Sequence, residues 1–112
     1  MAQQMTTGTL TSGSSTVDAN ASDFDNLMVQ LTGTWVGNIE IQGSLDGTNY
    51  RALHVEDATD NGGYGYLQIT TNGIWRPSRF NGILGLQKVR VKFTTYTSGT
   101  TTVTVVLASS AK

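Results

Sequence analysis

Residues 33–55, GTWVGNIEIQGSLDGTNYRALHV, contain two alternating runs joined by a turn. The first run places polar residues on one side and, on the other, Ile39, Ile41 and Gly43. A period of two residues predicts a β-strand with one buried face. Asp46-Gly47 then predicts a hairpin turn, because glycine accepts the positive φ that primed turns require. Residues 50–55 are predicted to return as the partner strand.

Alternation recurs on both sides of this stretch. The predicted inward side chains are Leu27, Val29 and Leu31, then Leu67 and Ile69, then Val89, Val91 and Phe93, and finally Val103, Val105 and Leu107. Turns are expected at Gly33-Thr34 and at residues 96–99, YTSG, and Pro77 is expected to end a strand. No stretch has a helical period. The sequence therefore predicts an all-β protein: a single antiparallel β-sandwich of about eight strands, as a jelly roll or a related Greek-key fold.

The chain is expected to contain one domain with a distinct N-terminal segment. Residues 1–22 are small and polar, and two interpretations stay open for them. They form either a flexible arm or weak edge strands over 6–11 and 16–19. Residues 23–112 are predicted to form the sandwich itself.

Composition excludes several classes of protein. The absence of cysteine rules out disulfides and thiolate metal sites, and fits folding in a reducing cytosol. The first residues lack the basic and apolar regions of a secretory signal, and no run reaches the length of a membrane span. We therefore expect no membrane partner. Only 13% of the residues are charged, so the surface is either suited to packing against other protein or is a threonine-rich sandwich face exposed to water.

The net charge of −1 hides an asymmetry along the chain. Residues 1–60 carry all eight acids and one base, whereas residues 61–112 carry six bases and no acid. In one interpretation the two halves pair within the sandwich. In the other, subunits meet head to tail, acidic face against basic face. The second interpretation predicts an oligomer or shell interface at Lys88, Arg90, Lys92, Asp57 and Asp60.

Catalytic patterns are missing, so we expect no enzyme, no catalytic residue and no cofactor. His54 is the only histidine, without an acid in register, and no nucleophile elbow occurs. Asp57, Asp60 and Asn61 offer oxygen atoms, but their spacing does not match a calcium loop, so no metal site is predicted. The basic row at 88–92 lacks interleaved aromatic residues and the sequence pI is about 5.6, so no nucleic-acid partner is expected.

Aromatic residues leave one binding class open. A sugar-stacking platform could include Trp35, Trp75, Tyr64 and Tyr66. The alternative is that these rings belong to the core and its rim, with their polar tips on internal partners.

Several segments carry a resemblance. The series GTWVGNIEIQGSLDGTNYRAL, then Trp75, then GLQKVRVKFTTYTSGTTTVTVVLAS resembles small β-sandwich modules of tailed bacteriophage virions, over residues 29–109. The matching positions are Gly43-Ser44, Asp46-Gly47-Thr48, Tyr50, Gly85, Val89-Arg90-Val91 and residues 96–100. Such modules occur in head decoration (cement) proteins and in fibre or tail proteins.

The resemblance implies a non-enzymatic virion structural protein. It implies a capsid decoration or cement protein that binds the major capsid protein and itself, as a homotrimer, on the outer capsid surface after synthesis in the host cytoplasm. The threonine-rich faces and the N-terminal segment would then contact the shell. The alternative that the resemblance also allows is a fibre or tail module that binds a host glycan.

Overall fold

A computed structural model describes residues 3–59, 66–77 and 85–109 of the chain. These residues form an antiparallel sheet of seven strands, and they contain no helix that could cross a membrane. The strands are β1 (Gln3–Leu10), β2 (Thr16–Asn20), β3 (Asn26–Ser44), β4 (Arg51–Ala52), β5 (Val55–Asp57), β6 (Gly73–Pro77) and β7 (Lys88–Ala108). The prediction of an all-β, antiparallel sandwich-like fold is confirmed.

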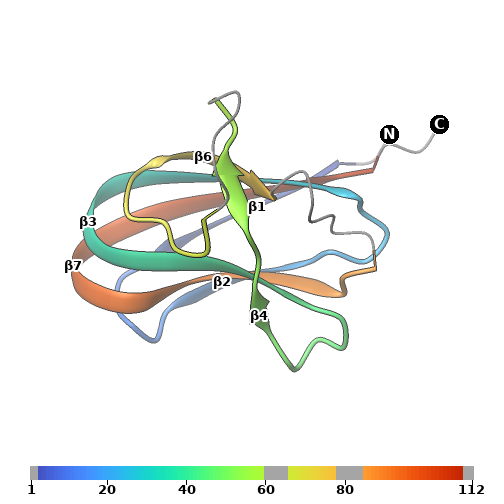
Figure 1. Cartoon of the computed structure of the whole chain (residues 1–112), viewed down its shortest axis with the longest axis horizontal. Helices are drawn as coiled ribbons and strands as arrows, with labels where there is room; N and C mark the ends of the chain where they lie inside the picture. The colour runs from blue at the N-terminus through green and yellow to red at the C-terminus, as the bar shows by residue number, and fades with distance from the viewer. Residues whose placement is uncertain (1–2, 60–65, 78–84, 110–112) are drawn as a thin grey trace.

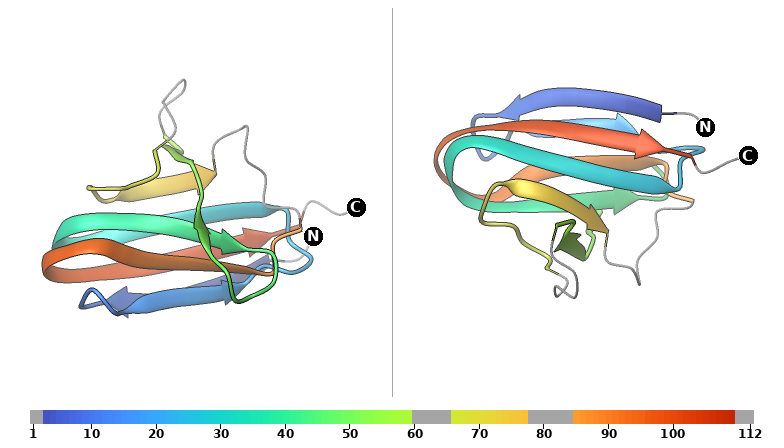
Figure 2. Two further views of the ribbon diagram at one scale, coloured as in Figure 1. Left: turned by 60° about the horizontal axis from the view of Figure 1, so that its bottom comes forward. Right: turned by 90° about the horizontal axis from the view of Figure 1, so that it is seen from above.

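Two long strands build the framework (Figure 1). β3 and β7 have 19 and 21 residues, and they pair along their whole length, from Asn26 opposite Ala108 to Ser44 opposite Lys88. The pair bends back on itself, so that one sheet becomes two layers (Figure 2). Layer A contains β1, residues 100–108 of β7, residues 26–33 of β3, β6 and β5. Layer B contains β2, residues 88–95 of β7, residues 38–44 of β3, and β4.

The predictions of strand ends at Gly33-Thr34 and at residues 96–99 are wrong, because both strands continue through these positions. Gly33 and Gly99 have positive φ angles of 108° and 92°. The pairing register also shifts twice, passing over Thr94 and Thr97 of β7. Positive φ and bulges bend a strand without ending it, which is how strands pass from one layer to another. The expected turn residues are thus the corner of the sandwich.

The core lies between the two layers and follows the predicted alternation. The inward residues predicted in β3 and β7 are all buried: Leu27, Val29, Leu31, Ile39, Ile41, Val89, Val91, Phe93, Val103, Val105 and Leu107. The prediction for Ile69 is confirmed, but that for Leu67 is wrong, since its exposed fraction is 45%. Residues 66–72 make isolated bridges and no strand, so the two-residue period does not apply to them.

The turn after β3 differs from the predicted two-residue turn. β4 pairs with Gln42 and Gly43, and the connection is the longer loop 45–50. Asp46 organises this loop: its carboxylate accepts bonds from the backbone N–H groups of Thr48 and Asn49, each 2.8 Å. Val55 does not continue the hairpin but pairs with Pro77 in layer A. The loop is stable because one carboxylate satisfies several donors, a local arrangement that competes with a tight turn.

Loss of the Asp46 charge should reduce stability most at neutral pH. The backbone N–H of Asn49, then that of Thr48, hold the pKa of Asp46 well below its usual range. The unfolded chain therefore takes up this proton first, and the stabilisation is complete above the ordinary aspartate pKa and lost as pH falls below about 4. For Asp46→Asn, the deficit in unfolding free energy measured by urea denaturation should shrink below that pH. A deficit of constant size down to about pH 2 would contradict this account.

Thr101 offers a test of the core. It is fully buried, and its hydroxyl has no hydrogen-bond partner among the described residues. Thr101→Val keeps the shape and removes the unsatisfied group, so it should raise the unfolding free energy by about 1 kcal/mol in chemical denaturation. Thr100→Val, at the exposed neighbouring position, is the control and should give no gain. Equal effects of the two substitutions would contradict the prediction.

The N-terminal residues contain β1 and β2. Both strands pair with β7, β1 in layer A and β2 in layer B, and the connection 11–15 passes between the layers. Leu10 is fully buried, so the end of β1 contributes to the core. These strands therefore belong to the two-layer structure.

Candidate interaction surfaces

Over β1, β3 and β7, the outer surface of layer A carries no charged residue. Cross-strand neighbours form rows: Met5, Val106 and Met28 in one, Thr7, Thr104, Gln30 and Ile74 in the next, and Thr9, Thr102 and Thr32 in the third. We call these ten residues the neutral face. Their positions follow from the strand period, because each inward core residue leaves its neighbours pointing outward.

Part of the neutral face is apolar and exposed. Met5 is 67% exposed and Met28 38%. Met28, Gln30, Ile74, Thr104 and Val106 line a shallow hollow of about 230 Å³. Contiguous apolar patches on a small protein commonly mark sites of contact with other proteins. The neutral face is therefore a candidate contact surface.

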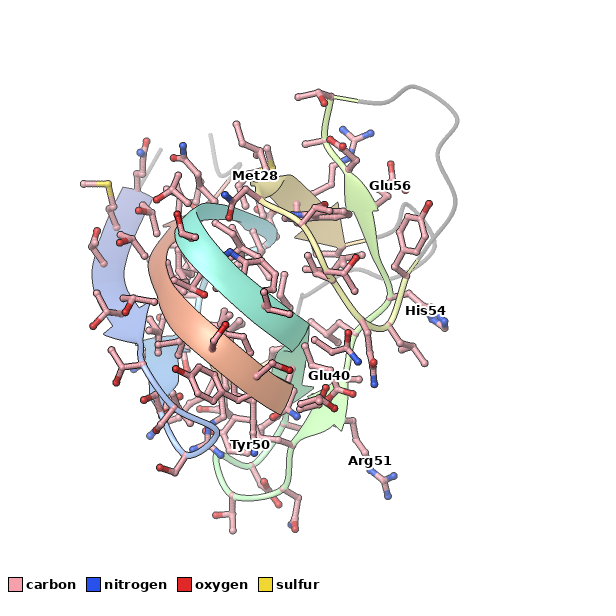
Figure 3. The ribbon with its side chains drawn as sticks, turned by 90° about the vertical axis from the view of Figure 1, so that its left-hand side faces the viewer. Met28, Glu40, Tyr50, Arg51, His54 and Glu56 are labelled. Atoms are coloured by element: carbon pink, nitrogen blue, oxygen red, sulfur yellow. The ribbon has the colours of Figure 1, made fainter. Side chains whose placement is uncertain are left out.

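The outer surface of layer B is charged. Arg90 lies opposite Asp18 and donates to both carboxylate oxygens, at 3.0 and 3.2 Å. Its guanidinium also covers the Tyr50 ring, 3.9 Å from the ring centre. The hydrogen bonds to Asp18 raise the pKa of Arg90 above its usual value. Lys88, Lys92 and Glu40 share this surface, which we call the charged face. Figure 3 shows Met28 and Glu40 on different layers.

The two ion pairs found among the described residues join the acidic and basic halves of the chain. They are Asp18–Arg90 and Glu56–Arg76, the latter with a 2.7 Å contact to a largely buried carboxylate. Each therefore pairs an acid from residues 1–60 with a base from residues 61–112 inside one molecule. This is the arrangement expected if the acidic and basic halves of the chain pair within one sandwich.

The residues of the predicted head-to-tail interface do not share one surface. Lys88, Arg90 and Lys92 lie on the charged face of layer B. Asp57 lies in β5 of layer A, where the backbone N–H and the hydroxyl of Thr59 lower the pKa of its carboxyl. Asp60 lies outside the described residues.

The four aromatic residues considered for sugar binding are divided by the fold. The Trp35 indole donates to the Asn72 side chain at 2.6 Å, and its ring packs edge-on against Phe93. Trp75 is buried, and its ring meets that of the exposed Tyr66 edge-on, at 6.1 Å and 89°. Tyr64 lies outside the described residues. The structure thus brings together Tyr66 and Trp75 and gives Trp35 separate internal contacts.

A polar hollow lies beside Tyr66 and Trp75. It has a volume of about 280 Å³ and is lined by Asp57, Tyr66, Gln68, Ile69, Thr70, Thr71 and Trp75. The indole N–H of Trp75 is buried and has no hydrogen-bond partner among the described residues. Carboxylate, amide and hydroxyl groups next to an exposed ring are the groups that bind polar ring-shaped ligands.

The described residues contain no cluster of side chains that could bind a metal ion. Within ranges 3–59, 66–77 and 85–109, no three His, Cys, Asp or Glu side chains gather as metal ligands would. His54 is exposed between β4 and β5 and points away from the sandwich (Figure 3). Besides the two outer faces and the polar hollow, a further hollow of about 440 Å³ lies beside the loop 45–50, lined by Gly43, Leu45, Asp46, Asn49, Arg51, Leu53 and Leu86.

Sequence reasoning expected threonine-rich contact faces, but it did not identify the residues that together form the neutral face. Met5, Met28 and Ile74 come from three distant segments, and only the strand pairing aligns them. The alternation of residues 27–31 predicted that Met28 points outward, but it did not predict which residues lie beside it. The same holds for Gln68, Thr70 and Thr71, which no pattern in the sequence singles out.

The fold and its surfaces define an antiparallel two-layer β-protein with separate neutral and charged faces. No family model matches the chain, and no curated protein matches it. Among solved structures, it is similar to the SPBc2 prophage-derived protein YomS, with a TM-score of 0.70 and 18% identity over 96% of each chain. It is also similar to a protein of Bacillus endospore appendages, described as disulfide-linked pili, with a TM-score of 0.50 and 14% identity over 97% of this chain and 88% of that chain. At these identities the similarities show a shared fold.

Proposed function

We propose that this chain is a non-enzymatic structural protein of a bacteriophage virion, which decorates the outer capsid surface and stabilises contacts between capsomers. The observation that carries the proposal is the neutral face, on a fold that a prophage-derived protein shares. The sequence resemblance to virion modules supports the same role. The partner would be the major capsid protein.

The proposed mechanism depends on buried area. A shell filled with DNA is weakest at the seams between its subunits, and a rigid module that spans a seam adds buried surface there. Each contact can be weak, because many copies on one shell act together. The neutral face suits this role, since its threonines and apolar side chains carry no charge that burial would penalise.

Assembly would proceed without disulfide bonds. The appendage protein that shares the fold is described as forming disulfide-linked pili, but this chain has no cysteine.

Particle binding tests the proposal. In the double variant Met28→Glu/Thr104→Glu, two acids enter the neutral face at positions that do not support the core. Co-sedimentation with particles that lack the protein should fall at least about tenfold, because burying the new charges is costly. Removing residues 1–12 would be a poorer test, since Leu10 belongs to the core.

The matched control is Thr16→Glu/Asn20→Glu. It adds the same charge on the charged face, opposite Lys92 and Lys88, and should leave binding unchanged. Equal binding by both double variants, or no binding by the wild-type protein, would overturn the proposal.

A second candidate function is the binding of a host glycan by a fibre or tail module. The polar hollow favours it, because Tyr66 is 47% exposed beside Asp57 and Gln68. A glycan array with the wild-type protein tests it, followed by Tyr66→Ala, which should weaken binding at least about tenfold. Tyr50→Ala, on the charged face, is the control. An array without any bound saccharide would exclude this function.

A further inference from the structure

The outer edge of β1 is a long strand edge without protective charges. β1 has eight residues, QQMTTGTL, and it ends the strand order of layer A with β7 on one side. None of its residues is charged and none is proline. Alternate residues of an edge strand direct their N–H and C=O groups away from the sheet, where another strand can pair with them. Among the described residues, no segment pairs with this side of β1.

The other edges in the described part of the chain are shorter or charged. β2 has five residues and carries Asp18, and β4 has two residues and carries Arg51. β5 has three residues, two of them acidic, and Val55 exchanges two backbone hydrogen bonds with Tyr66 there. Short length, charge and a covering segment are the devices by which proteins protect sheet edges. β1 has none of these devices.

We propose that β1 pairs with β1 of a second copy of this chain, antiparallel about a two-fold axis, which joins the layer A sheets of two molecules. In a two-fold pairing, a strand lies opposite its own copy. The charges within that strand therefore decide whether the pairing is favourable, because like charges on opposite strands repel. In β1 no register opposes like charges, because the strand is neutral. In the central register, a two-fold pairing would place Asp18 opposite its own copy in β2, and Glu56 opposite its own copy in β5.

Side chains on both sides of the strand fit this pairing. Met5, Thr7 and Thr9 are exposed on the neutral face, where they would meet the partner's equivalents. Exposed threonine and methionine can pack across strands at little cost, and threonine pairs stabilise them. On the inner side, Gly8 packs closely against Val17 of β2. The joined sheet would make the two neutral faces continuous.

This inference does not depend on the proposed virion role. It predicts a dimer, whereas the virion resemblance implies a trimer, so the two can be separated by mass. The particle test changes Met28 of β3 and Thr104 of β7, and neither residue belongs to β1. Because Thr104 is the cross-strand neighbour of Thr7, the mass of that double variant is measured too and should remain that of a dimer. Particle binding could therefore fail while the dimer persists, or the reverse.

The test is the mass in solution of the full chain and of Met5→Lys/Thr7→Lys, by light scattering coupled to size exclusion. The wild-type protein should have twice the mass of one chain at high concentration. The variant should be a monomer, with its dissociation constant raised at least about tenfold, because lysine on an edge strand opposes pairing. Thr32→Lys, on the central strand β3 of the same face, is the control and should remain a dimer.

A mixing experiment distinguishes strand pairing from a folding defect. Met5→Glu/Thr7→Glu should also be a monomer alone, but equal amounts of the Lys and Glu variants should form a mixed dimer, since opposite charges across strands attract. A wild-type monomer at all concentrations, a trimer, a dimer that survives the lysines, or failure of the mixed pair to form would each overturn the proposal.

Discussion

Replacing Phe93 with alanine should lower the free energy of unfolding by about 3–5 kcal/mol. Phe93 is among the largest fully buried side chains, with an exposed fraction of 1%. It lies just before the corner of β7, where its ring packs edge-on against Trp35 at 5.7 Å and Tyr96 at 5.0 Å. Alanine would leave a cavity where the two long strands bend, and the rigid strands on either side cannot close it.

Chemical denaturation of both proteins at one pH measures this effect. The control is Phe24→Ala, because the same atoms are removed from a ring that is only partly buried against the core. We expect the control to lose less than half as much stability, since the loss rises with the cavity left behind. Similar losses at the two positions would show that the corner has no special role in stability.

Replacing Gly99 with alanine should cost about 3 kcal/mol or more, from backbone strain and a direct clash. Gly99 has φ of 92°, a region that side chains disfavour. A Cβ atom there would press on the carbonyl oxygen of Thr34 and lie 2.6 Å from Cα of Trp35. Both contacts are with the backbone of β3, so relief would require the two long strands to separate at the corner.

Gly47→Ala measures the cost of backbone strain without the clash. Gly47 also has positive φ, 80°, but its nearest contact would be the flexible Lys88 side chain at 3.8 Å. We expect a loss of about 1–2 kcal/mol there, which is the cost of left-handed backbone alone. If thermal and chemical unfolding gave the same loss for both variants, the close approach of β3 and β7 at Gly99 would be refuted.

The alternating core could be predicted from the sequence because strand period and burial coincide. The odd-numbered positions of β3 and β7 are buried on both sides of the bend, and local sequence contains that information. The bend itself could not be predicted. Gly33 and residues 96–99 have the composition of turns, and only the pairing of β3 with β7 makes them a corner of two continuous strands.

The conformation of loop 45–50 and the composition of the outer faces could not be predicted, because they depend on particular hydrogen bonds and on strand register. Asp46-Gly47 correctly marked a reversal, but a carboxylate that binds several N–H groups favoured a longer loop over a primed turn. The charge asymmetry was visible in the sequence. Which acid pairs with which base, Asp18 with Arg90 and Glu56 with Arg76, could be known only from the strand register. The neutral face needed the same information.

The difference between two cryo-EM maps tests the central claim most directly: intact phage particles that carry this chain against particles from which its gene is deleted. The account predicts extra density on the outer shell of the first particles, fitted by the two-layer sandwich with the neutral face, including Met28 and Thr104, turned toward the capsid. Identical maps, with the chain absent from the particles, would contradict the proposed function.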